Sequence, residues 1–115
     1  MVDVPRDRFE ELVAEALDEI PEGLGRLMDN VAVLVRDGHP DGDLLGHYEG
    51  IPLTERFEGY DGMVLPDRIT VYRLPILAIC ADEAEVVEQV RITVVHEVAH
   101  HFGIGDDRLD ELGWA

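Results

Sequence analysis

The sequence predicts an α+β fold in which a small mixed or antiparallel sheet packs on one long central helix. Apolar residues recur at helical spacing over residues 7–20 and again over residues 83–102. Two shorter segments, residues 31–35 and 68–72, carry the continuous or alternating apolar patterns of strands. A length of 115 residues is that of one domain, so we expect a single domain over residues 1–115.

The N-terminal helix is predicted from a stripe of apolar residues whose opposite face is almost entirely acidic. The stripe consists of Phe9, Leu12, Val13, Ala16, Leu17 and Ile20. Pro21 should end this helix, because proline disfavours the helical conformation of the residue before it. We interpret the acidic face as a solvated surface.

Two strands and a region of loops are expected next along the chain. The run over residues 31–35 is continuous and mostly β-branched, which is typical of a buried strand. Residues 38–62 are rich in Gly, Pro and Asp, so they should form loops with short elements near residues 44–45 and Tyr48. Residues 68–72 alternate in polarity and predict a second strand.

The central helix is predicted by the longest periodic segment, residues 83–102. Asp82 is a suitable N-cap, and acidic residues follow in the first turn, where the helix dipole favours them. Gly103 and Gly105 should end the helix. A short amphipathic tail, residues 107–112, is predicted to add a last turn or two of helix.

The composition excludes several kinds of chemistry. The chain has no Ser and no Lys, so it has neither a serine nucleophile nor the lysine of a phosphate-binding loop or a Schiff base. Cys80 is the only cysteine and lies in an apolar run, which indicates a buried, inert thiol. A formal charge of -17 argues against binding nucleic acid or an anionic membrane. Because neither a signal peptide nor a membrane-length apolar run is apparent, we predict a cytoplasmic protein.

A metal site is predicted by the pattern H-E-x-x-H in the central helix, formed by His96, Glu97 and His100. Residues four apart on a helix project in nearly the same direction, so the two histidines can bind one metal ion with Glu97 beside them. With Gly103 and Asp106 also in place, the pattern would arise by chance in about one chain in 4000 of this composition. On a helical wheel the histidines lie on a polar strip outside the apolar arc, which favours metal binding over a packing role.

A third ligand is expected, because a catalytic zinc site usually has three protein ligands and one open position. Gly103 can adopt the left-handed conformation that turns the chain back toward the metal, which makes Asp106 the best-placed donor. Its neighbour Asp107 is the alternative. His101 is rotated by ~100° from His100 on a helix, so we expect it to pack or to form a surface hydrogen bond.

The stretch H-E-V-A-H-H-F-G-I-G-D resembles the zincin metallopeptidases that carry an H-E-x-x-H-x-x-G-x-x-D signature. The chain is similar over most of its length to very small bacterial proteins described as minimal zincins. Residues 47–56 and 65–73 also resemble those proteins, but they are less specific than the motif. The resemblance implies a zincin-like domain with one zinc ion (Zn2+) per chain. It assigns the zinc ligands His96, His100 and Asp106 and the catalytic carboxylate Glu97.

The chain differs from the metzincins in the support beneath the metal. Metzincins have His at the position of Asp106 and a methionine turn under the metal, whereas none of the nine residues after Asp106 is Met. We expect Leu112 or Trp114 in the short tail to pack beneath the ligands instead.

These residues predict a zinc metallopeptidase, in which the metal activates water while Glu97 accepts a proton from it and passes the proton to the leaving amine. The partner would be a peptide or protein substrate, extended along an exposed strand edge beside the helix. Residues 69–72 are our candidate for that edge. Tyr60, Tyr72 and Arg73 are candidate oxyanion ligands, although each is expected to be structural.

Other histidines and acids receive smaller roles. His39 and His47 have no ligand spacing and are interpreted as structural or incidental. Asp107, Asp110 and Glu111 are available to orient the metal-binding imidazoles by hydrogen bonds.

The main alternative function is a zinc-binding module without peptidase activity that docks a partner through its acidic surface. A di-iron carboxylate bundle is rejected, because it needs a second E-x-x-H pattern and four long helices. A homo-oligomer is compatible with the sequence but does not follow from it.

Overall fold

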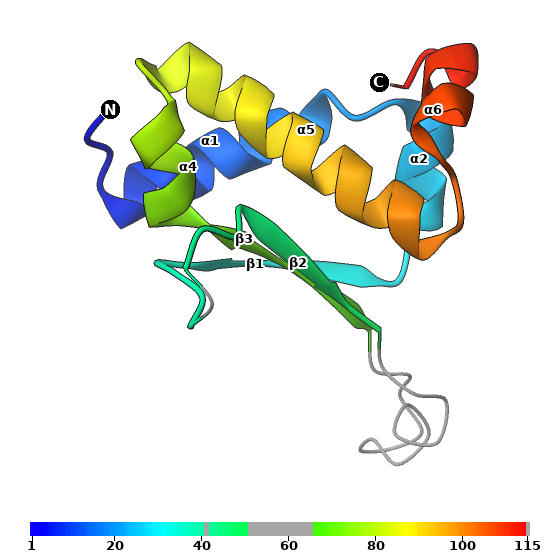
Figure 1. The fold of residues 1–115 in the computed structure, drawn as a ribbon, viewed down its shortest axis with the longest axis horizontal. Coiled ribbons are helices and arrows are strands. Elements are labelled where there is room, and N and C mark those ends of the chain that lie inside the picture. The colour runs from blue at the N-terminus through cyan, green and yellow to red at the C-terminus, as the bar shows by residue number, and fades with distance from the viewer. Residues whose placement is uncertain (41, 51–65, 115) are drawn as a thin grey trace.

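Three strands form a mixed sheet, and the described helices lie on one side of it (Figure 1). The structure is a computed structural model, and it describes residues 1–40, 42–50 and 66–114. The strand order is β1-β3-β2: β1 (Val31–Arg36) runs parallel to β3 (Asp67–Tyr72), and β2 (Gly46–Glu49) runs antiparallel to it. The α+β class with a small mixed sheet is therefore confirmed.

The central position belongs to β3, which corrects one expectation. Residues 69–72 were expected to form an exposed edge, but β3 pairs with β1 on one side and with β2 on the other. The edges of the described sheet are β1 and β2. Polar residues alternate in β3 because the strand has one solvated face, a pattern that central and edge strands share.

Alternation along the strands gives the sheet one apolar and one polar face. Ile69 and Val71 are fully buried on the side of the helices. On the opposite face, Arg68 of β3 donates to Glu49 of β2 at 2.6 Å. This division is typical of a small sheet that packs on helices with one face only.

Two long helices pack on the apolar face. Helix α1 (Arg6–Asp18) buries the predicted stripe, including Phe9 and Leu12, against α5 (Glu83–His101). Helix α5 crosses the sheet in Figure 1 and contacts both β2 and β3. Its predicted N-cap is confirmed: Asp82 accepts a hydrogen bond from the backbone N–H of Glu85 at 2.9 Å. Among the described residues, no helix is long and apolar enough to cross a membrane.

Three shorter helices complete the part of the fold that the structure describes. Helix α6 (Asp106–Leu112) confirms the predicted helical tail, whereas α2 (Glu22–Leu27) and α4 (Arg73–Ile79) were not foreseen. Pro75 lies in the first turn of α4, where the backbone N–H has no partner in the helix, so proline is tolerated there. Cys80 follows α4 and is only 3% exposed, and this burial raises the pKa of its thiol, as expected for an inert cysteine.

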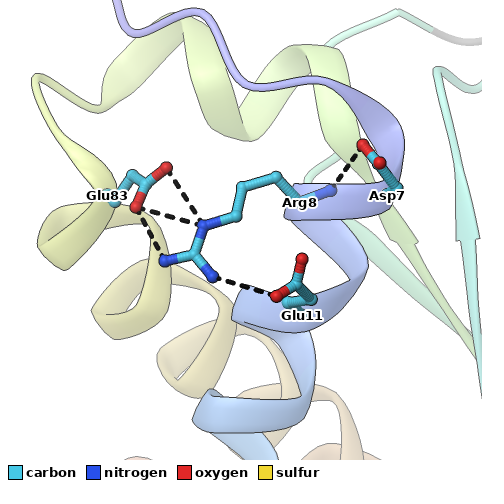
Figure 2. Close-up of polar contacts among 4 residues, drawn as sticks. All are labelled: Asp7, Arg8, Glu11 and Glu83. Atoms are coloured by element: carbon cyan, nitrogen blue, oxygen red, sulfur yellow. Dashed lines mark hydrogen bonds and ion pairs between the residues drawn. The ribbon is translucent and has the colours of Figure 1, made fainter.

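Arg8 links the beginnings of α1 and α5. Its guanidinium donates to Glu83 at 2.9 Å and to Glu11 at 3.3 Å, as Figure 2 shows. The hydrogen bond from Arg8 lowers the pKa of the Glu83 carboxyl. The contact ties the first turn of the site-bearing helix to the N-terminal helix.

Candidate metal centre

Helix α5 carries the motif residues on one side of its C-terminal half. His96 and His100 lie one turn apart, with nearly parallel rings whose centroids are 6.1 Å apart. Both histidines are exposed, while Glu97 is half-buried on the flank that faces β2. The spacing of the motif along a helix therefore produces the arrangement expected for a pair of metal ligands with a carboxylate beside them.

Gly103 reverses the chain after α5 and brings Asp106 toward the motif. Its φ of +75° is left-handed, its N–H bonds to the His100 carbonyl at 3.2 Å, and the N–H of Ile104 bonds to the Ala99 carbonyl at 2.7 Å. This pair of hydrogen bonds is the Schellman motif. The reversal leaves Asp106 Oδ1 3.9 Å from His100 Nε2, at the first residue of α6.

The donor set suits zinc. Two imidazole nitrogens and one carboxylate oxygen are ligands that catalytic zinc sites use, and a fourth position would stay open. The side chains of His100 and Asp106 are 60% and 75% exposed, so both can rotate toward a shared ion. As they stand, no three His, Cys, Asp or Glu side chains within residues 1–40, 42–50 and 66–114 are grouped closely enough to hold a metal. Asp106 lies near His100, and its assignment as the third ligand in preference to Asp107 stays a prediction.

A groove of about 180 Å³ lies between α5 and β2, next to the motif. Its lining residues are Leu45, Gly46, Gln89, Ile92, Thr93, His96 and Glu97. A Cβ on Gly46 would lie only 2.6 Å from Thr93 Cγ2, so the absence of a side chain lets β2 approach the helix. Two larger hollows, of about 530 and 540 Å³, lie beside α1 and include none of the motif residues.

A family model described as a zincin-like metallopeptidase matches residues 28–114. The chain belongs to the zincin-like metallopeptidase family. A conserved hypothetical protein of solved structure from T. thermophilus is similar to this zincin-like chain, with 25% identity and a TM-score of 0.55. The match covers 86% of this chain and 94% of that one, so the fold extends over nearly the whole of both. A comparison with curated proteins finds no match.

The zincin-like domain also contains a contact network that sequence reasoning missed. The rings of Tyr48 and His101 stack with centroids 3.9 Å apart, and the Tyr48 hydroxyl donates to Asp67 at 2.6 Å. Asp67 is only 6% exposed, and its Oδ2 lies 3.7 Å from His101 Nε2. Packing of His101 was expected, but its partners come from two strands whose pairing could not be foreseen.

The candidate oxyanion ligands have other roles where the structure describes them. Tyr72 is buried and meets His39 edge-on, with ring centroids 5.4 Å apart. Arg73 donates to the Val4 carbonyl at 2.7 Å and to Asp37 at 3.0 Å. These contacts fit a structural part for Tyr72 and Arg73, their candidate role toward an oxyanion stays a prediction, and Tyr60 lies outside the described residues.

The C-terminal tail contacts helix α2. Trp114 lies against α2, where a Cβ on Gly23 would come within 2.5 Å of its ring. The backbone N–H of Trp114 bonds to the Leu109 carbonyl at 2.9 Å, which holds the tail to α6. The predicted support of the ligands by Leu112 or Trp114 therefore stays a prediction, while the contact that the structure gives Trp114 is with α2.

Proposed function

We propose that this zincin-like protein is a zinc-dependent peptidase in which His96, His100 and Asp106 bind the metal and Glu97 is the general base. One observation carries the proposal. His96 and Glu97 line the groove beside the edge strand β2, and Asp106 approaches His100 at the end of the same helix. Membership of a metallopeptidase family supports the same reaction class.

The position of β2 supports binding of an extended peptide. In the described part of the chain β2 is an edge strand of the sheet, and sheet edges are where many proteins bind an extended peptide. Gly46 keeps β2 close to α5, so a peptide on that edge would pass near Glu97. The strand edge beside the site is therefore assigned to β2 and no longer to residues 69–72.

The chemistry proposed for the site divides between the metal and Glu97. Bound by the three ligands, zinc would act as a Lewis acid toward a peptide carbonyl and an attacking water molecule. Glu97 accepts a proton from the water molecule while the oxygen of that water bonds to the carbonyl carbon. Glu97 then gives that proton to the amine nitrogen as the C–N bond breaks, which leaves a carboxylate and a free amine.

Metal content tests the ligand set. We expect the purified protein to contain about one zinc per chain, and Asp106→Ala to lose most of it. The matched control is Asp107→Ala, which removes the neighbouring carboxylate of the same helix turn and should keep its zinc. If Asp106→Ala keeps its zinc and Asp107→Ala loses it, Asp107 is the third ligand instead of Asp106.

Hydrolysis of an unfolded protein such as casein tests the catalytic role. Glu97→Gln should keep its zinc and lose hydrolysis by about 100-fold or more, because it removes the general base. Equal rates with and without the substitution would exclude Glu97 as the base. A protein that holds zinc but shows no hydrolysis in either form would instead be the non-catalytic module with an acidic docking surface.

A further inference from the structure

The inner side of β2 follows one side of α5 with a matched repeat. Two residues of a strand advance by ~6.6 Å, and four residues of a helix advance by ~6 Å, so successive contacts stay in step. A Cβ on Gly46 would meet Thr93, and a Cβ on Gly50 would lie 3.2 Å from His101 Cε1. The facing residues are Gly46, Tyr48 and Gly50 on the strand side and Thr93, Glu97 and His101 on the helix.

Contacts of His101 with the sheet hold β2 and α5 in this alignment. Its ring lies flat on the ring of Tyr48, at an interplanar angle of 18°. The hydroxyl of Tyr48 bonds at 2.6 Å to Asp67, which lies in the central strand and is buried. The same carboxylate is 3.7 Å from His101 Nε2, which is too far for a direct hydrogen bond. Tyr48 of β2 and Asp67 of β3 therefore both lie against the side chain of His101 on α5.

We propose that Tyr48, Asp67 and His101 form a positioning clamp, which fixes the last turn of α5 and thereby orients His100 for metal binding. The inference rests on the proposed zinc site, but none of the three residues is assigned to bind the metal. The last turn of a helix opens more readily than the helix centre. A clamped last turn presents His100 already ordered, so metal binding loses less conformational entropy.

The clamp has the position that this role requires. His101 is the last residue of α5 and the neighbour of His100, and the reversal at Gly103 begins two residues later. A turn that rotated about the helix axis would displace both His100 and the chain that leads to Asp106. Contacts of His101 with the sheet oppose that rotation, because the sheet is paired on both sides of β3.

Cobalt(II) titration of the full chain tests the clamp, because the visible spectrum reports coordination geometry independently of peptidase activity. His101→Ala should weaken cobalt binding by about tenfold or more and alter the spectrum, as changes beside metal ligands commonly do. His101→Phe keeps a ring for Tyr48 to stack on but has no donor nitrogen. It should recover most of the affinity, a result that also excludes His101 as a ligand.

His47→Gln is the matched control, because His47 is an exposed histidine on the outer side of β2. We expect His47→Gln to bind cobalt with the affinity of the wild type.

If His101→Ala has the cobalt affinity and spectrum of the wild type, the clamp is overturned while the zinc site stays intact. Failure of the wild type itself to bind cobalt would overturn the proposed metal site and the clamp with it. Circular dichroism shows whether each variant is folded, and Tyr48→Phe offers a second variant that removes only the hydroxyl bonded to Asp67.

Discussion

At the scale of single residues, Gly46 decides how closely the edge strand can lie to the helix that carries the motif. Its missing side chain leaves room for Thr93 Cγ2, at 2.6 Å from where a Cβ would stand, and for the Thr70 carbonyl oxygen at 3.2 Å. Both distances are shorter than ordinary packing allows, and one of the atoms belongs to the backbone of the central strand. The groove beside Glu97 therefore depends on a residue that contributes no chemistry.

Gly46→Ala should lower the free energy of unfolding by about 1–3 kcal/mol, because it overpacks the contact between β2 and α5. Urea denaturation measures the change. Gly38→Ala is the control, since a Cβ on Gly38 meets nothing within 4 Å, and it should stay within about 0.5 kcal/mol of the wild type. Thr93→Ser removes the methyl group that the new Cβ would meet, so the double variant should be less destabilised than the sum of the single ones. Strict additivity would contradict this account of Gly46.

At the scale of secondary-structure elements, the end of α5 is what joins the two histidines to Asp106. The helix stops in a Schellman motif at Gly103, and α6 begins three residues later. The φ of +75° at Gly103 is accessible to glycine at little cost, whereas a side chain is strained there. Gly113, which ends α6 with a φ of +72°, has the same conformation away from the motif.

Gly103→Ala and Gly113→Ala should each cost about 1 kcal/mol of stability, because both place a Cβ in the left-handed region with open space around it. Only Gly103→Ala should also weaken zinc binding, since it alters the path from His100 to Asp106. Competition with a chromophoric chelator measures the zinc affinity of both variants beside the wild type. Unchanged zinc affinity in Gly103→Ala, despite the loss of stability, would show that this turn does not set the position of the third ligand.

Local spacing made some elements and part of the candidate site predictable. The pair His96 and His100, the cap at Asp82 and the turn at Gly103 all depend on residues a few positions apart, so their geometry follows from helix periodicity. Helix α4 was missed because it is short and almost wholly apolar, which removes the periodic contrast that identifies an amphipathic helix.

The strand order and the network around His101 depend on contacts that sequence spacing does not encode. Tyr48 and Asp67 are 19 positions apart, and they meet only because β2 pairs with β3. The alternation in residues 68–72 identified a strand with one buried face, but it could not distinguish the centre of a sheet from its edge. The position of β3 between β1 and β2 follows from pairing across the chain.

At the scale of the whole molecule, the charge of -17 is arranged around helices that must pack together. The hollow of about 540 Å³ between α1 and α5 is lined by Glu15, Asp18, Glu19 and Glu88 and by two apolar residues. Like charges on two helices oppose their approach, and a net charge of this size destabilises a compact state. Contacts such as Arg8 with Glu83 therefore act against a general repulsion, and they connect the N-terminal helix to the helix that carries the motif (Figure 2).

The Arg8 contact should make part of the stability depend on pH. The hydrogen bond from Arg8 lowers the pKa of Glu83 from its ordinary value of 4.5, so the folded state favours the ionised carboxylate. A depressed pKa contributes stability above the unfolded value, and that contribution is lost as the pH falls through the folded value. The wild type should therefore be more stable than Glu83→Gln at about pH 7, and the difference should become smaller as the pH is lowered to about 3. Urea denaturation at both pH values measures the difference.

A double-mutant cycle with Arg8→Gln and Glu83→Gln separates the Arg8–Glu83 ion pair from the interaction of Glu83 with the helix dipole. The ion pair needs both residues, whereas the dipole interaction needs only Glu83. If the coupling between Arg8 and Glu83 is as large near pH 3 as near pH 7, the contact does not act through the ionised carboxylate.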